Sequence, residues 1–141
     1  MFIYNMSLQF SCSVKAELSS HPVFLPFFFS CSNEPPLISV TPTEVDLGEI
    51  NRFENSSRSF EVTIKNIGGK PLHIKSILRD CESCTSVELE DSIIKSGSES
   101  QLQITFESKD FFAGPIEKTV FINSDAQNMP EVMVNFSADL K

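Results

Sequence analysis

The sequence is poor in the residues on which many binding proteins and catalysts depend. It has no tryptophan, one tyrosine and two histidines, and only 11 lysines and arginines stand against 19 aspartates and glutamates. The formal net charge of −8 repels the phosphate backbone of nucleic acids, and no run of basic residues offsets it locally. The scarcity of tryptophan and tyrosine also argues against binding of polysaccharide through exposed aromatic rings. Nucleic acid is therefore excluded as an expected partner.

Long hydrophobic runs are also missing. The apolar stretch over residues 23–29 is far shorter than the ~20 residues that a membrane-spanning helix needs, and Pro26 interrupts it. With 141 residues, of which 40% are hydrophobic and 21% charged, the chain has the composition of one globular domain with a short appendage. We therefore expect contact with a membrane only through a lipid anchor.

The first 37 residues lack the alternation of apolar and polar residues that marks the rest of the chain. Their stretch FFFSCSNEPP resembles a bacterial lipobox, in which an apolar run and Ser30 precede a cysteine, Cys31, and a polar tether. On this interpretation residues 1–37 are an export signal and spacer, Cys31 carries a lipid at the mature N-terminus, and Ser32–Leu37 is flexible. The mature protein is then an exported lipoprotein of the periplasm, the outer membrane or the cell surface.

Two other interpretations of this segment stay open. Lys15 is the only lysine or arginine before the apolar run, whereas the start of an export signal is normally richer in positive charge. The segment can therefore be another type of export signal, or a strand or tail whose phenylalanines pack on the domain. Cys12 would be removed together with a signal, and we assign it no role.

From Ile38 onward, apolar and polar residues alternate with the period of two that is typical of half-buried strands. No window sustains helical spacing over three turns, and turn-forming segments separate the alternating runs. The phase of one run shifts after Ile74, which predicts a bulge. The pattern predicts an all-β fold for residues 38–141, an immunoglobulin-like β-sandwich of about seven strands. The predicted strands are LISV, EVDLGEI, SFEVTIKN, PLHIKSIL, QLQITFE, KTVFIN and EVMVNFSA.

Several segments of this part of the chain follow one another in a recognisable order: EVDLGEI, FEVTIKNIGGKPLHI, a cysteine pair, ITF and GPIEKTVFINSD. Together they resemble the bacterial secreted family known as domain of unknown function 1573, over about residues 38–140. The resemblance implies an immunoglobulin-like sandwich related to major-sperm-protein and cilia-associated domains. Its strongest part is the pattern N-x-G-x-x-P-L-x-I, which this chain matches at Asn66, Gly68, Pro71, Leu72 and Ile74.

Asn66, Gly68, Gly69 and Pro71 are expected to form a structural turn between two strands. The side chain of Asn66 can bond to nearby backbone and fix the turn. Gly68 and Gly69 permit positive φ after the first strand. Pro71 begins the next strand at a place where no ladder donor is needed.

Cys81 and Cys84 form a CxxC pair in the segment RDCESCTSV, where the family usually has Ser-Cys-Gly-Cys-Thr, one residue shorter between the cysteines. Redox catalysts place such a pair at the start of a helix, whereas this pair follows an extended run and precedes TSVELED, another expected strand. Zinc needs two further cysteine or histidine ligands, and the flanking acids Asp80 and Glu82 would raise the thiol pKa values. We favour a local structural disulfide, because neighbouring thiols in an exported protein usually oxidise. Free thiols, a metal site and a redox role stay open as alternatives.

No catalytic residue, cofactor or metal site is expected elsewhere. The sequence contains no nucleophile elbow, glycine-rich phosphate loop or HExxH motif. The acidic residues Glu88, Glu90 and Asp91 are expected to form a solvated strand face rather than a calcium site. Phe111 and Phe112 are expected to cover the core beneath a loop, with an exposed contact patch as the alternative.

These patterns favour a non-enzymatic module of the bacterial envelope with an interaction or structural role. Its expected partner is a protein or another envelope component that the sequence does not specify. Strand edges or the loops at one end of the sandwich would provide the contacts. The alternative function is thiol redox chemistry or metal handling by Cys81 and Cys84.

Overall fold

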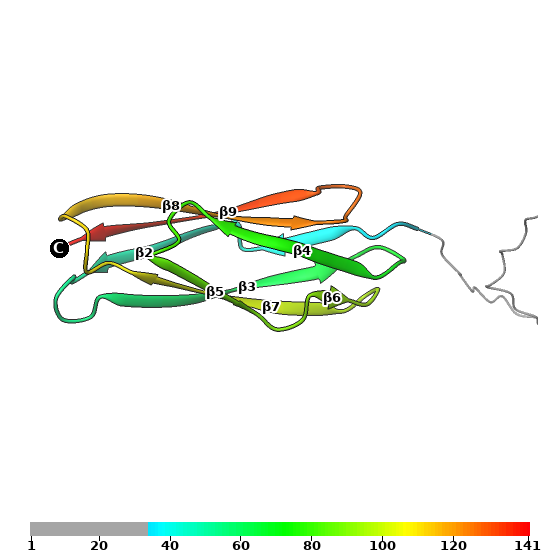
Figure 1. The fold of residues 1–141 in the computed structure, drawn as a ribbon, viewed down its shortest axis with the longest axis horizontal. Helices are drawn as coiled ribbons and strands as arrows, with labels where there is room; N and C mark the ends of the chain where they lie inside the picture. Colours follow the sequence, from blue (N-terminus) through cyan, green and yellow to red (C-terminus); the bar gives the residue numbers. More distant parts are fainter. Residues whose placement is uncertain (1–33) are drawn as a thin grey trace, which may run out of the picture. The chain divides into compact units, whose positions relative to one another are not determined.

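The computed structural model describes residues 34–141, which consist of nine β-strands and no helix (Figure 1). None of these residues belongs to a helix long and apolar enough to cross a membrane. The all-β prediction is confirmed. The strands are β1 (Ile38–Thr41), β2 (Glu44–Ile50), β3 (Ser57–Asn66), β4 (Leu72–Arg79), β5 (Thr85–Leu89), β6 (Ile93–Ile94), β7 (Glu99–Glu107), β8 (Gly114–Ser124) and β9 (Glu131–Leu140).

The predicted number of about seven strands is wrong, because β5 and β6 add to the seven runs that alternate clearly. β5 lies in TSVELED, which the sequence marks as extended. β6 contains only Ile93 and Ile94, and two residues are too few to show an alternating pattern. β6 is defined by its pairing with the start of β4 rather than by any local signal.

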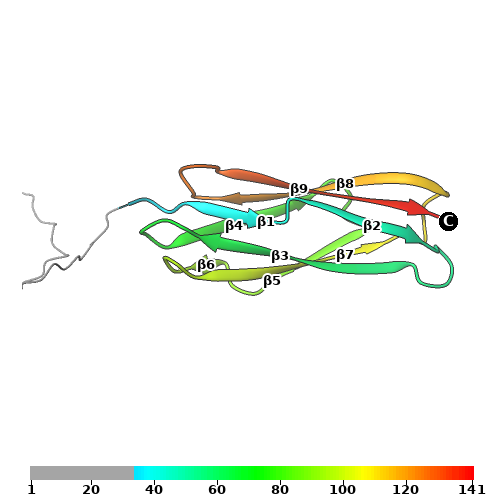
Figure 2. The same ribbon diagram turned by 180° about the vertical axis from the view of Figure 1, so that it is seen from behind.

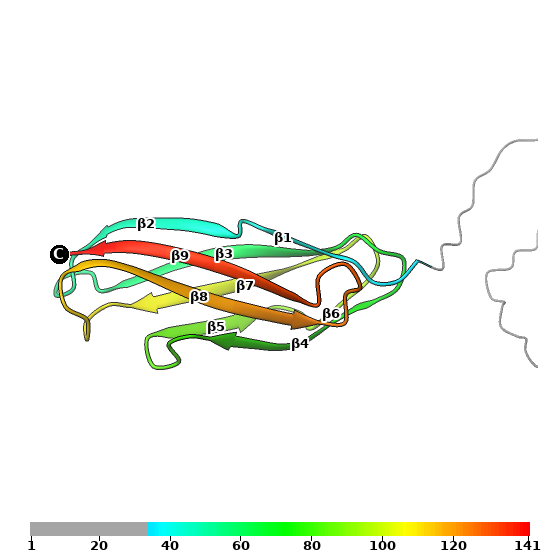
Figure 3. The same ribbon diagram turned by 90° about the horizontal axis from the view of Figure 1, so that it is seen from above.

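The strands form two sheets that face each other as a sandwich (Figures 1 and 2). One sheet has the order β1-β3-β7-β5 and is antiparallel throughout. The other has the order β2-β9-β8-β4-β6, in which β2 runs parallel to β9. β1 and β2 follow each other closely along the chain but belong to different sheets, so this segment closes one side of the sandwich. The chain enters β1 from one end of the sandwich, and the C-terminus lies at the opposite end (Figure 3).

The core fills the space between the sheets with aliphatic side chains and phenylalanine, as alternation of inward residues requires. Phe136 of β9 lies between two other rings, with centroid distances of 5.3 Å to Phe60 and 5.6 Å to Phe106. The largest fully buried side chains are Phe106, Phe136, Ile38, Ile50, Ile64, Leu72, Leu102, Ile104, Ile122, Leu140, Val62 and Val120. Residues from both sheets thus build one continuous core.

β4 contains the bulge that the shift in its hydrophobic pattern predicts. Its pairing with β8 changes register between Ile74 and Ser76. As a result Ile77 packs against the core although it is three positions from Ile74. The bulge turns the side chain of Leu78 outward, where 51% of it is exposed.

The segment before β1 is tied to the sandwich more closely than its prediction as a flexible spacer implies. The carbonyl oxygens of Pro35 and Leu37 accept hydrogen bonds from Gly69 N and Ile67 N, at 3.2 and 2.9 Å. The carbonyl oxygen of Pro36 accepts one from a residue in the connection between β8 and β9. The part of the predicted spacer that is free of these bonds is therefore shorter than residues 32–37.

Candidate functional site

The predicted turn after β3 is organised by Asn66, which is completely buried. Its Oδ1 accepts a hydrogen bond from Gly68 N at 2.9 Å, which closes the turn on itself. Its Nδ2 donates to the carbonyl oxygens of Lys70 at 2.7 Å and Ile94 at 2.9 Å. One side chain thus joins the end of β3, the connection to β4 and the end of β6.

Gly68 is needed in this turn for a different reason from the predicted one. Positive φ values occur at Gly48, Gly97 and Gly114, and neither Gly68 nor Gly69 is among them. A Cβ atom on Gly68 would collide with the carbonyl oxygen of Pro35 and lie 2.5 Å from Leu37 N. The expectation of positive φ is therefore wrong. Gly68 permits the close approach of residues 35–37, a contact between distant segments that local turn rules do not reveal.

Cys81 and Cys84 are joined in a disulfide, with their Cα atoms 5.5 Å apart. The disulfide closes a turn in which Thr85 N donates to the carbonyl oxygen of Cys81 at 3.1 Å. Cys84 is 6% exposed and belongs to the core, whereas Cys81 is partly buried. The sulfur atoms are therefore largely covered on the side of Cys84.

The disulfide turn is also bonded to both sheets. Asp80 and Thr119 of β8 exchange two bonds: Asp80 N donates to the carbonyl oxygen of Thr119 at 3.1 Å, and Thr119 N donates to Asp80 Oδ2 at 3.0 Å. Glu107 N of β7 donates to the carbonyl oxygen of Cys84 at 2.8 Å. The turn carries the chain from β4 in one sheet to β5 in the other and is fixed at each end.

The disulfide turn lacks the features that a metal site or a redox catalyst needs, as far as residues 34–141 show. Among residues 34–141 no group of three or more histidine, cysteine, aspartate or glutamate side chains is placed to hold a metal ion. The turn connects two strands, so no helix N-terminus acts on the sulfur atoms. Neither sulfur atom therefore lies at the start of a helix, where redox catalysts place such a pair.

The histidine at position 73 forms an ion-pair contact at the other end of β4. His73 Nδ1 lies 2.8 Å from Asp125 Oδ2, and His73 N donates to Asp125 Oδ1 at 2.8 Å. Burial alone would raise the pKa of Asp125, but the hydrogen bonds and charge of His73 outweigh burial and hold that pKa below its usual value. The imidazole therefore anchors the connection between β8 and β9.

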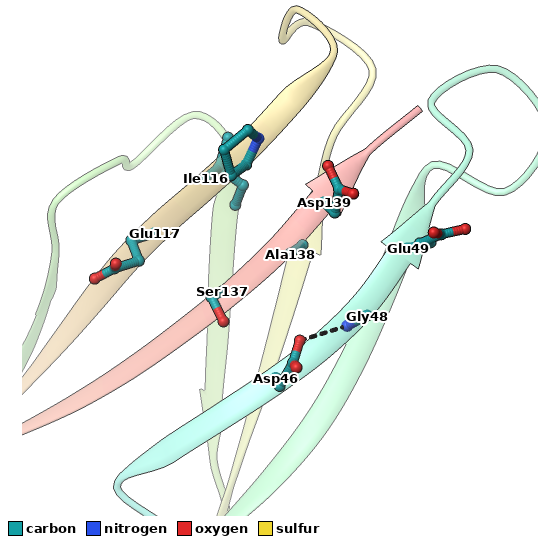
Figure 4. Close-up of a pocket in the computed structure, with 9 residues that line it drawn as sticks. Asp46, Gly48, Glu49, Ile116, Glu117, Ser137, Ala138 and Asp139 are labelled. Atoms are coloured by element: carbon teal, nitrogen blue, oxygen red, sulfur yellow. Dashed lines mark hydrogen bonds between the residues drawn. The ribbon is translucent and has the colours of Figure 1, made fainter.

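An acidic hollow of about 500 Å³ lies on the outer face of the five-stranded sheet, where the pairing of β2 with β9 shifts register (Figure 4). Three of its four carboxylates, those of Asp46, Glu49 and Asp139, have partners within the fold. Asp46 accepts a hydrogen bond from Gly48 N at 2.9 Å. Lys141 Nζ lies 2.7 Å from Asp139 and 3.7 Å from Glu49. The hydrogen bond to Asp139 and the charges of Asp139 and Glu49 raise the pKa of Lys141, whose positive charge offsets one of these two carboxylates.

Two loops at the end of the sandwich that holds the C-terminus expose phenylalanines. Phe53 in the β2–β3 loop is 81% exposed, and Phe112 in the β7–β8 loop is 91% exposed. Arg52 links the loops: its Nη1 donates to the carbonyl oxygen of Phe111 at 2.8 Å, and its guanidinium lies 4.9 Å from the ring centre of Phe53. Phe111 packs on Phe106 at 5.6 Å. The sequence gives no reason to distinguish Phe111 from Phe112. In the structure Phe111 covers the core, whereas the ring of Phe112 is exposed.

Cys31, the predicted lipidation site, lies outside the described residues, as does Cys12. The lipid anchor therefore stays a prediction. The structure does not bring the remaining predicted residues together in one site. The turn residues Asn66, Gly68, Gly69 and Pro71 precede β4, and the two cysteines follow it. The exposed Phe53 has no sequence signal of its own, because isolated phenylalanines in a loop segment are common in both settings.

Comparison with known proteins begins with a family model described as "Protein of unknown function (DUF1573)", which matches residues 38–140. A search of curated proteins finds no match. A protein of unknown function from Porphyromonas gingivalis W83 has a similar fold, with a TM-score of 0.64 and 17% identity. The similarity covers 74% of this chain and 47% of that protein, so this chain spans about half of its length.

Two further solved structures resemble the sandwich. The ASH / PapD-like domain 7 of human CEP192 has a TM-score of 0.56 and 11% identity, over 89% of this chain and 98% of that one. The VesB protease of Vibrio cholerae has a TM-score of 0.54 and 10% identity, over 72% of this chain and 31% of that one. At these identities the likeness concerns the fold alone, which is immunoglobulin-like and PapD-like. Because the family model covers the sandwich from the start of β1 to the end of β9, this chain belongs to the DUF1573 family.

Proposed function

We propose that this protein is a non-enzymatic interaction or structural module of the bacterial envelope, held at a membrane by a lipid on Cys31. The observation that carries the proposal is the placement of the exposed phenylalanines. Phe53 and Phe112 lie on loops at the end of the sandwich opposite Glu34, so they face away from a tether that enters there. Rigid, exposed aromatic side chains are frequent anchors of protein interfaces.

The clamp made by Arg52 supports this role. An exposed loop normally loses entropy when it binds a partner, and a loop that is already fixed loses less. Arg52 donates to the carbonyl oxygens of Phe111 and Lys141, at 2.8 and 3.1 Å. These bonds hold the two loops in one arrangement, with both phenylalanine rings presented to solvent.

The short tether sets the distance between the module and the membrane. Only Ser32 and Asn33 separate Cys31 from Glu34, and the carbonyl oxygen of Pro35 is already bonded to the sandwich. Three or four residues can span at most on the order of 10 Å. A lipid on Cys31 would therefore hold the sandwich close to the membrane surface, with the phenylalanine loops projecting outward.

Mass spectrometry of the mature N-terminus from native cells tests the anchor. We expect a chain that begins at Cys31 and carries diacylglycerol. An intact Met1 would overturn both the anchor and the export that it requires. A variant with Cys31→Ser is the control, because it should lose the lipid mass and leave the membrane fraction.

The alternative function, thiol redox chemistry or metal handling by Cys81 and Cys84, predicts a different result in a thiol titration. If the pair is structural, the folded protein shows no reactive thiol from these residues and resists mild reductants. A pair that cycles readily, or a metal that co-purifies and is lost on Cys81→Ser, would replace the interaction role with this alternative.

A further inference from the structure

The two sheets of the sandwich end in four edge strands, and these edges differ in how they are blocked. β1 and β5 border the four-stranded sheet, and β2 and β6 border the five-stranded sheet. An open edge presents unpaired N–H and C=O groups that pair readily with another strand, so natural sheets usually block their edges.

A side chain and a proline block the edge of β1. Ile38 N donates to Asn128 Oδ1, and Asn128 Nδ2 donates to the carbonyl oxygen of Ile38, both at 2.9 Å. Pro42 follows directly after the last residue of β1. The amide of Asn128 therefore occupies the place that an added strand would take.

Irregular backbone blocks the edge of β2 and the part of β4 that the two-residue β6 leaves uncovered. The pairing of β2 with β9 shifts register between Asp46 and Glu49, and Gly48 there has a φ of 74°. β6 covers the start of β4, and the bulge that follows contains the exposed Lys75. Bulges and lysines are devices by which natural sheets prevent pairing at an edge.

β5 has none of these devices and forms the free border of its sheet (Figure 3). Its sequence TSVEL contains no proline, glycine or basic residue, and it pairs with β7 over five consecutive residues without a register shift. Because Glu107 N donates to the carbonyl oxygen of Cys84, the even-numbered residues of β5 bond to β7. The N–H and C=O groups of Val87 and Leu89 therefore point to the open edge. They have no hydrogen-bond partner among residues 34–141.

The side chains of β5 specify what kind of strand would fit beside it. Val87 and Leu89 are partly buried and pack against the core, so an added strand would extend this layer with apolar side chains at alternate positions. The other face is acidic. Glu88 and Glu61 flank Gln103 of β7 in register and line a shallow hollow of about 380 Å³.

A second copy of this chain fits the edge less well than a basic strand does. Antiparallel pairing of two β5 strands centred on Val87 would set their two Glu88 side chains diagonally across from each other. Long side chains at diagonal positions are within reach of each other, so the two carboxylates would repel. A strand with lysine or arginine on this face would instead meet the carboxylate of Glu88, and Glu90 beyond it.

We infer that the open edge of β5 is a docking site for an extended segment of another protein, with apolar residues toward the core and basic residues toward Glu88. This inference rests on the proposed role as an interaction module and names one surface and the chemistry of its partner. The backbone groups of Val87 and Leu89 supply the hydrogen bonds. Glu88 selects the charge of the added strand.

Fluorescence anisotropy with a defined peptide tests the inference on the full chain. The probe is Thr-Val-Lys-Val-Lys-Val-Thr, labelled and blocked at both ends, and the comparison peptide has glutamate in place of both lysines. We expect the lysine peptide to bind at least about tenfold more tightly than the glutamate peptide. Glu88→Lys should remove or reverse this preference. No binding of the lysine peptide, or equal binding of the two peptides, would overturn the inference.

Val87→Pro is the variant aimed at the backbone, because it removes an N–H that points to the open edge and leaves the bonds to β7 in place. It should weaken peptide binding by about tenfold or more. The matched control is Val40→Pro, which removes an outward-facing N–H of β1 and should change binding by less than about twofold. Equal losses in the two variants would contradict docking at β5.

Hydrogen exchange of the unmodified chain gives a readout that needs no variant. The amide hydrogens of Val87 and Leu89 should exchange quickly in the free protein and slowly with the lysine peptide, whereas those of Ser86 and Glu88 are protected in both states. Peptide binding without this protection overturns the inference.

Dimerisation that Val87→Pro abolishes would replace the foreign strand with a second copy. The proposed function is tested separately by mass spectrometry of the mature N-terminus, so either proposal can fail without the other.

Discussion

The connections on the two sides of β4 hold the chain by different means. The glycine connection, residues 67–71, depends on one buried amide side chain and on a glycine that lets another segment come close. The cysteine connection, residues 80–84, depends on a covalent bond and on backbone bonds at each end. The first is therefore sensitive to the identity of single residues, whereas the second needs only that its ends stay tied.

This difference accounts for where the chain departs from the pattern of the family that it resembles. The glycine connection matches N-x-G-x-x-P-L-x-I at every specified position. The cysteine connection has one extra residue between its cysteines and still closes, with the two Cα atoms 5.5 Å apart. The extra residue lies inside a turn that is bonded at both ends, and β4 stays paired with β8 as far as Arg79 while β5 pairs with β7 from Thr85 onward.

Asn66→Ala should have the largest effect on stability. It leaves Gly68 N and the carbonyl oxygens of Lys70 and Ile94 without their partner, in a place with no access to solvent at Asn66 itself. The expected loss is about 3–5 kcal/mol in the free energy of unfolding, measured by urea denaturation. Asn123→Ala, which removes one exposed bond to Ser76, is the control and should lie within about 0.5 kcal/mol of the parent. A loss of similar size in both variants would show that the glycine connection does not depend on Asn66.

Gly68→Ala should have the next largest effect, because its Cβ would displace residues 35–37. The displacement breaks the bonds from Ile67 N and Gly69 N to that segment. We expect a loss of about 2–3 kcal/mol. Gly97→Ala separates crowding from backbone strain: its φ is 78° with open space around it, and it should cost only about 1 kcal/mol. If Gly97→Ala is the more damaging change, close packing is not what Gly68 provides.

Local patterns were sufficient to predict most strands, the bulge in β4 and the bond by which Asn66 fixes its own turn, because each depends on residues close together along the chain. The bond from Asn66 to Ile94 of β6, 28 residues away, was not predicted. The two-residue β6 and the packing of residues 35–37 against Gly68 were missed, since both are contacts between segments about 20 or more residues apart. The open edge of β5 was also hidden. An edge is defined by which strands fail to flank it, and the order of strands in a sheet is not a local property.

Reduction of the disulfide should cost less than either change in the glycine connection. The closed loop contains only about four residues, so the loop-closure term is about 1–2 kcal/mol, the low end for disulfides. The test compares urea denaturation of the full chain with and without a reductant. In the variant with both Cys81→Ala and Cys84→Ala, the reductant should have no effect, which assigns the change to this pair rather than to Cys12 or Cys31. A loss larger than that of Asn66→Ala would reverse the comparison between the two connections.

The smallest expected effect concerns His73, the second residue of β4. The pKa of Asp125 lies below its ordinary value of 3.8 in the folded chain, because the bonds from His73 outweigh the opposing effect of burial. A depressed carboxyl pKa contributes stability that is complete above the unfolded value and is lost as the pH falls through the folded value. Asp125→Asn keeps an oxygen that can accept the bond from His73 N but removes the charge. The parent should therefore exceed this variant in stability at about pH 6, and the difference should shrink as the pH falls below about 3.8 toward about 2. A difference that stays constant over this range would mean that the hydrogen bonds, and not the charge of Asp125, hold this end of β4.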